Sequence, residues 1–149
     1  MVTKFNPEGL AAMAHTGQEP IEVLLIEDNP GDVRLVKEVF KDSRLPYHLS
    51  VAKDGAEAVS FLQRHGTYAD APAPRLILLD LSLPKKGGLE MLEEMSPQLR
   101  KNGVRVVILT NSEAERDLDE SFTHGAVSYM VKPIDSEKLN LLLETLKEK

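Results

Sequence analysis

The sequence predicts an α/β protein built on a doubly wound, five-stranded parallel sheet. Apolar stretches of four to six residues, without strict alternation, are typical of strands buried on both faces. These stretches alternate with longer segments of helical periodicity, which favours βαβ units with helices on both sides of the sheet. Of the two common doubly wound arrangements, the strand order 2-1-3-4-5 fits this count. The expected strands are residues 21–26, 47–52, 76–79, 104–109 and 126–131.

The first helix is expected directly after residues 21–26. Asn29 is a good N-cap, Pro30 fits the first helical position, and Asp32 complements the helix dipole. The helix is expected to run to about Ser43. Residues 47–52 then alternate in polarity, as in a half-buried or edge strand.

The second and third helices flank the strand at residues 76–79. Asp54, with Glu57 three residues later, is a variant of the capping box and starts a helix that stops at Gly66. After the loop that follows Asp80, residues 89–95 make a short helix that ends before Ser96-Pro97.

The last two helices are predicted from their starting signals. Ser112 and Glu115 form a capping box that opens a helix ending at Gly125. Asp135 and Lys138 open the final helix, and its inward-facing side chains are leucines. They are Leu139, Leu142, Leu143 and Leu146.

Composition limits the classes of function. The net charge of −6 argues against general nucleic-acid binding, which needs a basic surface. The chain has no cysteine, which excludes disulfides, thiol catalysis and thiolate metal sites, and favours an intracellular, cytoplasmic setting. No apolar run approaches the roughly 20 residues of a membrane span. We expect residues 1–20 to be a loosely ordered arm and residues 21–149 to form one domain.

Polar residues follow four of the predicted strands at their carboxyl ends, where ligands bind in open α/β sheets. Taken singly, each has an ordinary interpretation as a helix-start acid, a turn or cap residue, a loop hydroxyl or a solvated lysine. The strand order, however, brings them together at the carboxyl-terminal edge of the sheet, which we call the rim. They are Glu27, Asp28, Asp80, Thr110 and Lys132.

This set of side chains suits phosphoryl transfer. Three carboxylates in one crevice repel each other unless a cation is present, and oxygen ligands of this kind suit Mg²⁺. A lysine can pair with a phosphate and a hydroxyl can donate to a phosphate oxygen. Because these strand ends carry no histidine, serine or cysteine, the nucleophile is expected to be a carboxylate that forms an aspartyl-phosphate.

Four motifs together resemble the receiver domain of two-component response regulators, with its flavodoxin-like fold. They are the acidic pair Glu27-Asp28, L-I-L-L-D with Asp80, V-V-I-L-T with Thr110, and Y-M-V-K-P with Tyr129, Lys132 and Pro133. The resemblance covers about residues 20–149. The stretches I-E-D-N-P-G-D and L-S-L-P-K-K, with no output domain after the last helix, are most similar to single-domain regulators that partner phytochrome-type histidine kinases, including bacteriophytochromes.

The resemblance implies a role for each site residue. Asp80 would accept a phosphoryl group from the phosphohistidine of a histidine kinase, and Lys132 would contact that group. Asp28 would bind Mg²⁺ directly and Glu27 through water, with Asp80 and the Ser82 backbone carbonyl as the other protein ligands. The Lys132–Pro133 peptide bond would be cis, which proline makes accessible at about 0.5–1 kcal/mol.

The resemblance also implies a switch and two contact surfaces. Thr110 would move toward the phosphoryl group and Tyr129 would turn inward behind it, although Tyr129 could instead simply pack against the helix before it. The face formed by residues 112–149 is expected to carry homodimerisation or partner binding. The kinase is expected to dock near the first helix and the loop that follows Lys132.

Two residues depart from the wider family. Gly87 stands where many receivers have an acid, and Asn111 stands where a small residue is usual. We expect Gly87 to alter the stiffness of its loop and Asn111 to narrow access to Asp80.

Two other functions are compatible with part of the pattern. A phosphohydrolase resembling haloacid dehalogenases would carry a second acid two residues after the nucleophile, where this chain has Ser82. An interaction module that keeps the fold without phosphorylation is opposed by the intact acids, Thr110 and Lys132.

Overall fold

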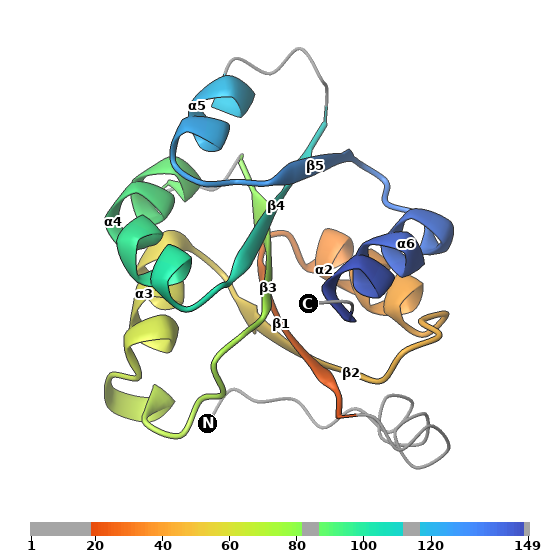
Figure 1. Ribbon diagram of the computed structural model, residues 1–149, viewed down its shortest axis with the longest axis horizontal. Helices are drawn as coiled ribbons and strands as arrows, with labels where there is room; N and C mark the ends of the chain where they lie inside the picture. Colours follow the sequence, from red (N-terminus) through yellow and green to blue (C-terminus); the bar gives the residue numbers. More distant parts are fainter. Residues whose placement is uncertain (1–18, 82–86, 112–116, 148–149) are drawn as a thin grey trace.

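A single parallel sheet organises the protein, which is described by a computed structural model covering residues 19–81, 87–111 and 117–147 (Figure 1). The strand order is β2-β1-β3-β4-β5, which confirms the predicted 2-1-3-4-5 topology. Of the expected N-terminal arm, residues 1–18 lie outside the described part. The strands are β1 (Ile21–Ile26), β2 (Tyr47–Ala52), β3 (Leu76–Asp80), β4 (Arg105–Thr110) and β5 (Ser128–Val131).

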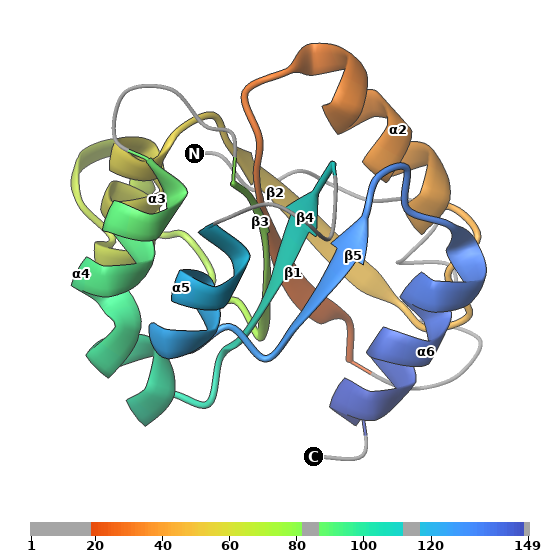
Figure 2. The same ribbon diagram turned by 90° about the horizontal axis from the view of Figure 1, so that it is seen from above.

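Helices cover both faces of the sheet (Figures 1 and 2). On one face α2 and α6 pack through residues such as Phe40 and Leu143, which are fully buried. On the other face α3, α4 and α5 pack through residues such as Phe61, Met91 and Leu118. The helices are α2 (Pro30–Phe40), α3 (Gly55–Gln63), α4 (Gly88–Lys101), α5 (Asp117–Thr123) and α6 (Ser136–Lys147).

Local capping starts three of these helices where the sequence predicts. Asn29 caps α2 and accepts a hydrogen bond from the Asp32 backbone at 3.0 Å. Asp54 caps α3 in the same way, accepting from the Glu57 backbone at 2.8 Å. Asp135 accepts from the first turn of α6. The predicted cap at Ser112 lies outside the described residues.

The predicted end of the third helix is wrong, because α4 continues through Pro97 to Lys101. A proline inside a helix costs about 3 kcal/mol through a lost hydrogen bond and a steric clash. The apolar face formed by Met91 and Met95 continues beyond the proline to Leu99, which is 3% exposed. Burial of that last turn against the sheet offsets the local cost.

The segment after α3 is more structured than a simple connector. The helix ends at Gln63, before the predicted Gly66, and Arg64 adopts a left-handed conformation with φ of 58°. A 3₁₀ turn, η1 (Gly66–Tyr68), follows and places Tyr68 against Phe61 with ring centroids 5.8 Å apart. Among the described residues, no helix has the length and apolarity to cross a membrane.

Candidate functional site

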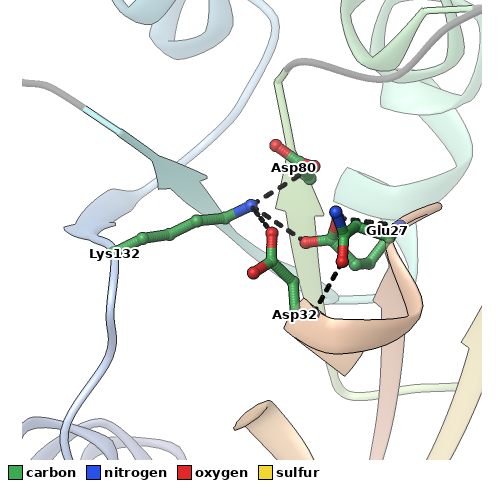
Figure 3. A network of polar contacts seen from close by, with 5 residues as sticks. Glu27, Asp32, Asp80 and Lys132 are labelled. Atoms are coloured by element: carbon green, nitrogen blue, oxygen red, sulfur yellow. Dashed lines mark hydrogen bonds and ion pairs between the residues drawn. The ribbon is translucent and has the colours of Figure 1, made fainter. Parts of the chain in front are cut away.

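Two buried acids form the centre of the carboxyl-terminal rim of the sheet (Figure 3). Glu27 directly follows β1 and is 1% exposed, and Asp80 ends β3 and is 3% exposed. Asp28, the next residue after Glu27, is exposed. The apolar residues of β1 and β3 pair in register, from Val23 with Leu76 onward, which fixes both strand ends at the same edge.

Lys132 follows β5 and contacts acids from three separate segments of the chain. Among the described residues, its Nζ lies 3.0 Å from Oε1 of Glu27, 3.1 Å from Oδ2 of Asp32 and 3.3 Å from Oδ2 of Asp80. Figure 3 shows the lysine reaching across the rim with these three carboxylates grouped around its tip. The Lys132–Pro133 peptide bond is cis.

The electrostatics of the cluster are unbalanced toward negative charge. Burial, reinforced by a hydrogen bond with Asp80, raises the pKa of Glu27 from its ordinary 4.5 to about 7, although Lys132 pulls in the opposite direction. Burial lowers the pKa of Lys132, but the carboxylates of Glu27 and Asp32 and the charge of Asp80 outweigh it and leave that pKa raised. The lysine is therefore charged, and one lysine does not fully balance its acids.

The same rim can hold a divalent cation. Glu27, Asp28 and Asp80 each offer a carboxylate oxygen, and these oxygens lie within 4.8 Å of one another. Oxygen-only ligand sets suit hard cations. Glu27 is buried beside Asp80, and a hydrogen bond with Asp80 and its charge add to the effect of burial in raising the pKa of Glu27, so the donor set fits a cation. The carbonyl of Ser82 lies outside the described residues.

Thr110 and Tyr129 lie on the two strands beyond Asp80. Thr110 ends β4, is 1% exposed, and accepts a hydrogen bond on its backbone carbonyl from the Lys132 backbone at 2.7 Å. Its neighbour Leu109 pairs in register with Asp80. Tyr129 packs on the face that α5 covers, edge-on to Phe122 with centroids 6.4 Å apart. Tyr129 therefore packs against the helix before it in this conformation, and its role as a switch stays a prediction.

Sequence reasoning missed Asp32 as a member of the site. It assigned Asp32 only to the dipole of the first helix, but the side chain also binds Lys132, which is 100 residues away. The available signal was the position of Asp32 in the first turn of a helix that starts at the rim.

A pocket of about 250 Å³ lies beside the contact between Asp32 and Lys132, and Asp32, Asn111, Lys132 and Pro133 line part of it. The effect of Asn111 on access to Asp80 stays a prediction, as does that of Gly87, whose backbone N–H donates to Glu90.

Sequence comparison identifies relatives over most of the chain. The family profile for the response regulator receiver domain matches residues 23–144. Response regulator Rcp1 of Synechocystis sp. (strain ATCC 27184 / PCC 6803 / Kazusa) is 42% identical over 122 residues, which span 80% of this chain and 82% of Rcp1. A solved structure of the Mn²⁺-bound form of Rcp1 covers 87% of this chain and 93% of its own, with 38% identity and a TM-score of 0.70.

Two further solved structures are similar. The phosphorylated cyanobacterial phytochrome response regulator RcpA is 35% identical, with a TM-score of 0.72, and covers 87% of this chain and 93% of its own. The bacteriophytochrome response regulator AtBRR is also 35% identical, with a TM-score of 0.74, and covers 87% of this chain and 94% of its own.

Proposed function

The chain belongs to the response regulator receiver family, and from that premise we propose that Asp80 accepts a phosphoryl group from the phosphohistidine of a sensor histidine kinase. The observation that carries this assignment is the Lys132 ammonium 3.3 Å from Oδ2 of Asp80, in a rim that also fits a cation. The phosphorylated state described for RcpA supports the same chemistry.

In the transfer, an Asp80 carboxylate oxygen forms a bond to phosphorus while the phosphorus–nitrogen bond of the donor breaks. The electron pair stays on the leaving imidazole nitrogen. The phosphoryl group brings negative charge to a rim that already holds Glu27, Asp28 and Asp80, so positive charge must balance it. Lys132 supplies one charge through a direct contact with the phosphoryl oxygens.

Mg²⁺ is the proposed cofactor, and when bound it neutralises negative charge on the transferred group. Asp28 would bind it directly and Glu27 through water, with Asp80 and the Ser82 carbonyl as the remaining protein ligands. The ligand spacing in the described residues and the Mn²⁺-bound form of Rcp1 support a divalent cation here.

Thr110 and Tyr129 are the proposed switch residues. The Thr110 hydroxyl would donate to a phosphoryl oxygen, because Thr110 directly follows the residue that pairs with Asp80. Movement of Thr110 would free space beneath Tyr129, whose ring would leave Phe122 and turn inward. Thr110 and Tyr129 would then have two packed arrangements, and phosphorylation of Asp80 would shift the equilibrium between them.

The histidine kinase is proposed to dock over α2 and the β5–α6 connection, in the cytoplasm. Leu35 on α2 is 54% exposed and lines the 250 Å³ pocket together with Pro133 and Ile134. This apolar surface lies beside Lys132 and therefore beside Asp80. A phytochrome-type kinase, such as a bacteriophytochrome, is the proposed partner because RcpA and AtBRR are phytochrome response regulators.

Output is proposed to pass through the face formed by α5, β5 and α6, as a homodimer or a partner interface. Among the described residues, large exposed apolar side chains gather in this stretch: Phe122 is 39% exposed, Val127 52% and Leu141 66%. Because Phe122 contacts Tyr129, a change at Tyr129 would reach this face directly. If the protein stays monomeric and its affinity for partners does not change on phosphorylation, this part of the proposal is wrong.

Intact mass after incubation with acetyl phosphate tests the central proposal. We expect a gain of one phosphoryl group that requires Mg²⁺ and is absent in Asp80→Asn. Rapid hydrolysis of acetyl phosphate with no accumulating adduct would indicate a phosphohydrolase instead. Failure to form an adduct under any condition would indicate an interaction module.

A further inference from the structure

The three carboxylates around Lys132 differ in what else they are needed for. An ammonium has three donors, so Glu27, Asp32 and Asp80 can each receive one. Glu27 and Asp80 also belong to the group that can hold a divalent cation, whereas Asp32 does not. Lys132 therefore shares two of its partners with the cation and has Asp32 as a partner outside the cation cluster.

Binding of a cation places two positive charges on the same carboxylates. Oε1 of Glu27 faces the ammonium, and Oε2 accepts from the Asn29 backbone at 3.3 Å, so both oxygens are already in use. A cation on Glu27 and Asp80 repels Lys132 from them. Phosphorylation changes the partners again, because Asp80 then carries the transferred group. The contact between Lys132 and Asp32 is the one that neither cation binding nor phosphorylation of Asp80 removes.

Asp32 is well placed to keep this contact. Its backbone N–H donates to the Asn29 side chain, which fixes it in the first turn of α2. The positive end of the helix dipole favours a carboxylate at that position. The side chain of Asp32 is 37% exposed and that of Glu27 is fully buried, so Asp32 lies on the outer side of the cluster. Figure 3 shows Asp32 on the first turn of α2, with its carboxylate directed at Lys132.

We propose that Asp32 is a positioning residue for Lys132, which anchors the ammonium beside Asp80 when the cation and then the phosphoryl group change the charges on the other carboxylates. This inference rests on the proposed phosphorylation of Asp80 for its phosphorylation part, and on the proposed cation site together with the described contacts for its metal part. Without Asp32, Lys132 depends on Glu27 and Asp80, and so competes more strongly with the cation.

A double-mutant cycle on Mg²⁺ affinity tests the metal part, with Mg²⁺ titrations followed by nuclear magnetic resonance. We expect Asp32→Asn to weaken Mg²⁺ binding about fivefold, the order of one partly exposed ion pair. Glu38→Gln, which removes the same charge from an exposed site on the same helix, is expected to change it by less than about twofold. When Lys132 is already replaced by Gln, Asp32→Asn should also change the Mg²⁺ affinity by less than about twofold.

The outcomes separate positioning from a general charge effect. If Asp32→Asn weakens Mg²⁺ binding equally with and without Lys132, Asp32 acts directly on the cation and the inference is overturned. The inference is equally overturned if Glu38→Gln has the same effect as Asp32→Asn. Should Lys132→Gln not fold, the Lys132 side-chain signals in Mg²⁺-saturated protein decide instead. They should shift toward those of a free lysine in Asp32→Asn and stay unchanged in Glu38→Gln.

The phosphorylation part has its own readout. At saturating Mg²⁺, we expect Asp32→Asn to slow the labelling of Asp80 by acetyl phosphate about fivefold, because Lys132 is held less firmly at the phosphoryl oxygens. An unchanged rate would overturn this part. If the wild-type protein takes no phosphoryl group at all, the proposed function fails, while the Mg²⁺ cycle still decides whether Asp32 positions Lys132.

Discussion

The buried carboxyl of Glu27 predicts that the cation-free protein loses stability as the pH rises. Burial and the hydrogen bond with Asp80 raise the pKa of Glu27 from 4.5 to about 7 in the folded protein. Between these values the folded protein retains a proton that the unfolded chain has released. Each pH unit in that window then lowers the free energy of unfolding by about 1.4 kcal/mol. The total loss is about 3 kcal/mol, absent below pH 4.5 and complete above about pH 7.

Urea unfolding in the presence of a chelator, followed by far-ultraviolet circular dichroism, measures this loss. Wild type and Glu27→Gln are compared at about pH 5 and about pH 8, because the amide variant cannot titrate while the other groups are the same. We expect the stability of wild type relative to Glu27→Gln to fall by up to about 3 kcal/mol over this range. Added Mg²⁺ should restore more stability at the higher pH, where Glu27 is ionised. A difference between the two proteins that does not change with pH would refute the reasoning.

Three further predictions concern the packing that supports the rim, and urea unfolding checks all of them. Gly88→Ala should lower the free energy of unfolding by about 1–2 kcal/mol, because the added Cβ would lie 3.0 Å from Leu79 Cδ1. An unchanged unfolding midpoint would show that α4 can shift away from β3. Asn140→Ala should cost about 2 kcal/mol, since this 5%-exposed amide holds α6 to the α2–β2 connection through two backbone hydrogen bonds. Asp54→Ala should cost about 1 kcal/mol by removing the cap of α3, and a loss as small as that of an exposed control, Thr145→Ala, would contradict it.

The strands and the starts of α2, α3 and α6 could be predicted because their causes are local. The run Leu76–Leu79 has no polar residue to place on a solvent face, so it suits a strand covered on both sides. Asn29 and Asp54 cap helices through hydrogen bonds to residues three positions away, and such short-range pairs are visible in the sequence. The strand order then followed from the number of βαβ units.

The misplaced helix end and the missed site residue have causes far away in the chain. Pro97 signals a helix end locally, but burial of Leu99 against the sheet carries α4 past it. Asp32 fits a helix start so well that no second role was needed to explain it. Its contact with Lys132 depends on where the β5–α6 connection returns to the rim, and no local pattern records that position.

The instability of the cation-free rim and its affinity for a cation have the same physical origin. Glu27 is buried beside Asp80, and the single positive charge of Lys132 is shared among the carboxylates of Glu27, Asp32 and Asp80. Without a cation, burial of Glu27 and its hydrogen bond with Asp80 keep a proton on Glu27 up to about pH 7. Because a bound cation must displace that proton, its affinity should weaken as the pH falls below about 7, and phosphorylation should weaken with it. Binding of a cation in place of that proton therefore recovers part of the free energy that ionised Glu27 costs the cation-free protein.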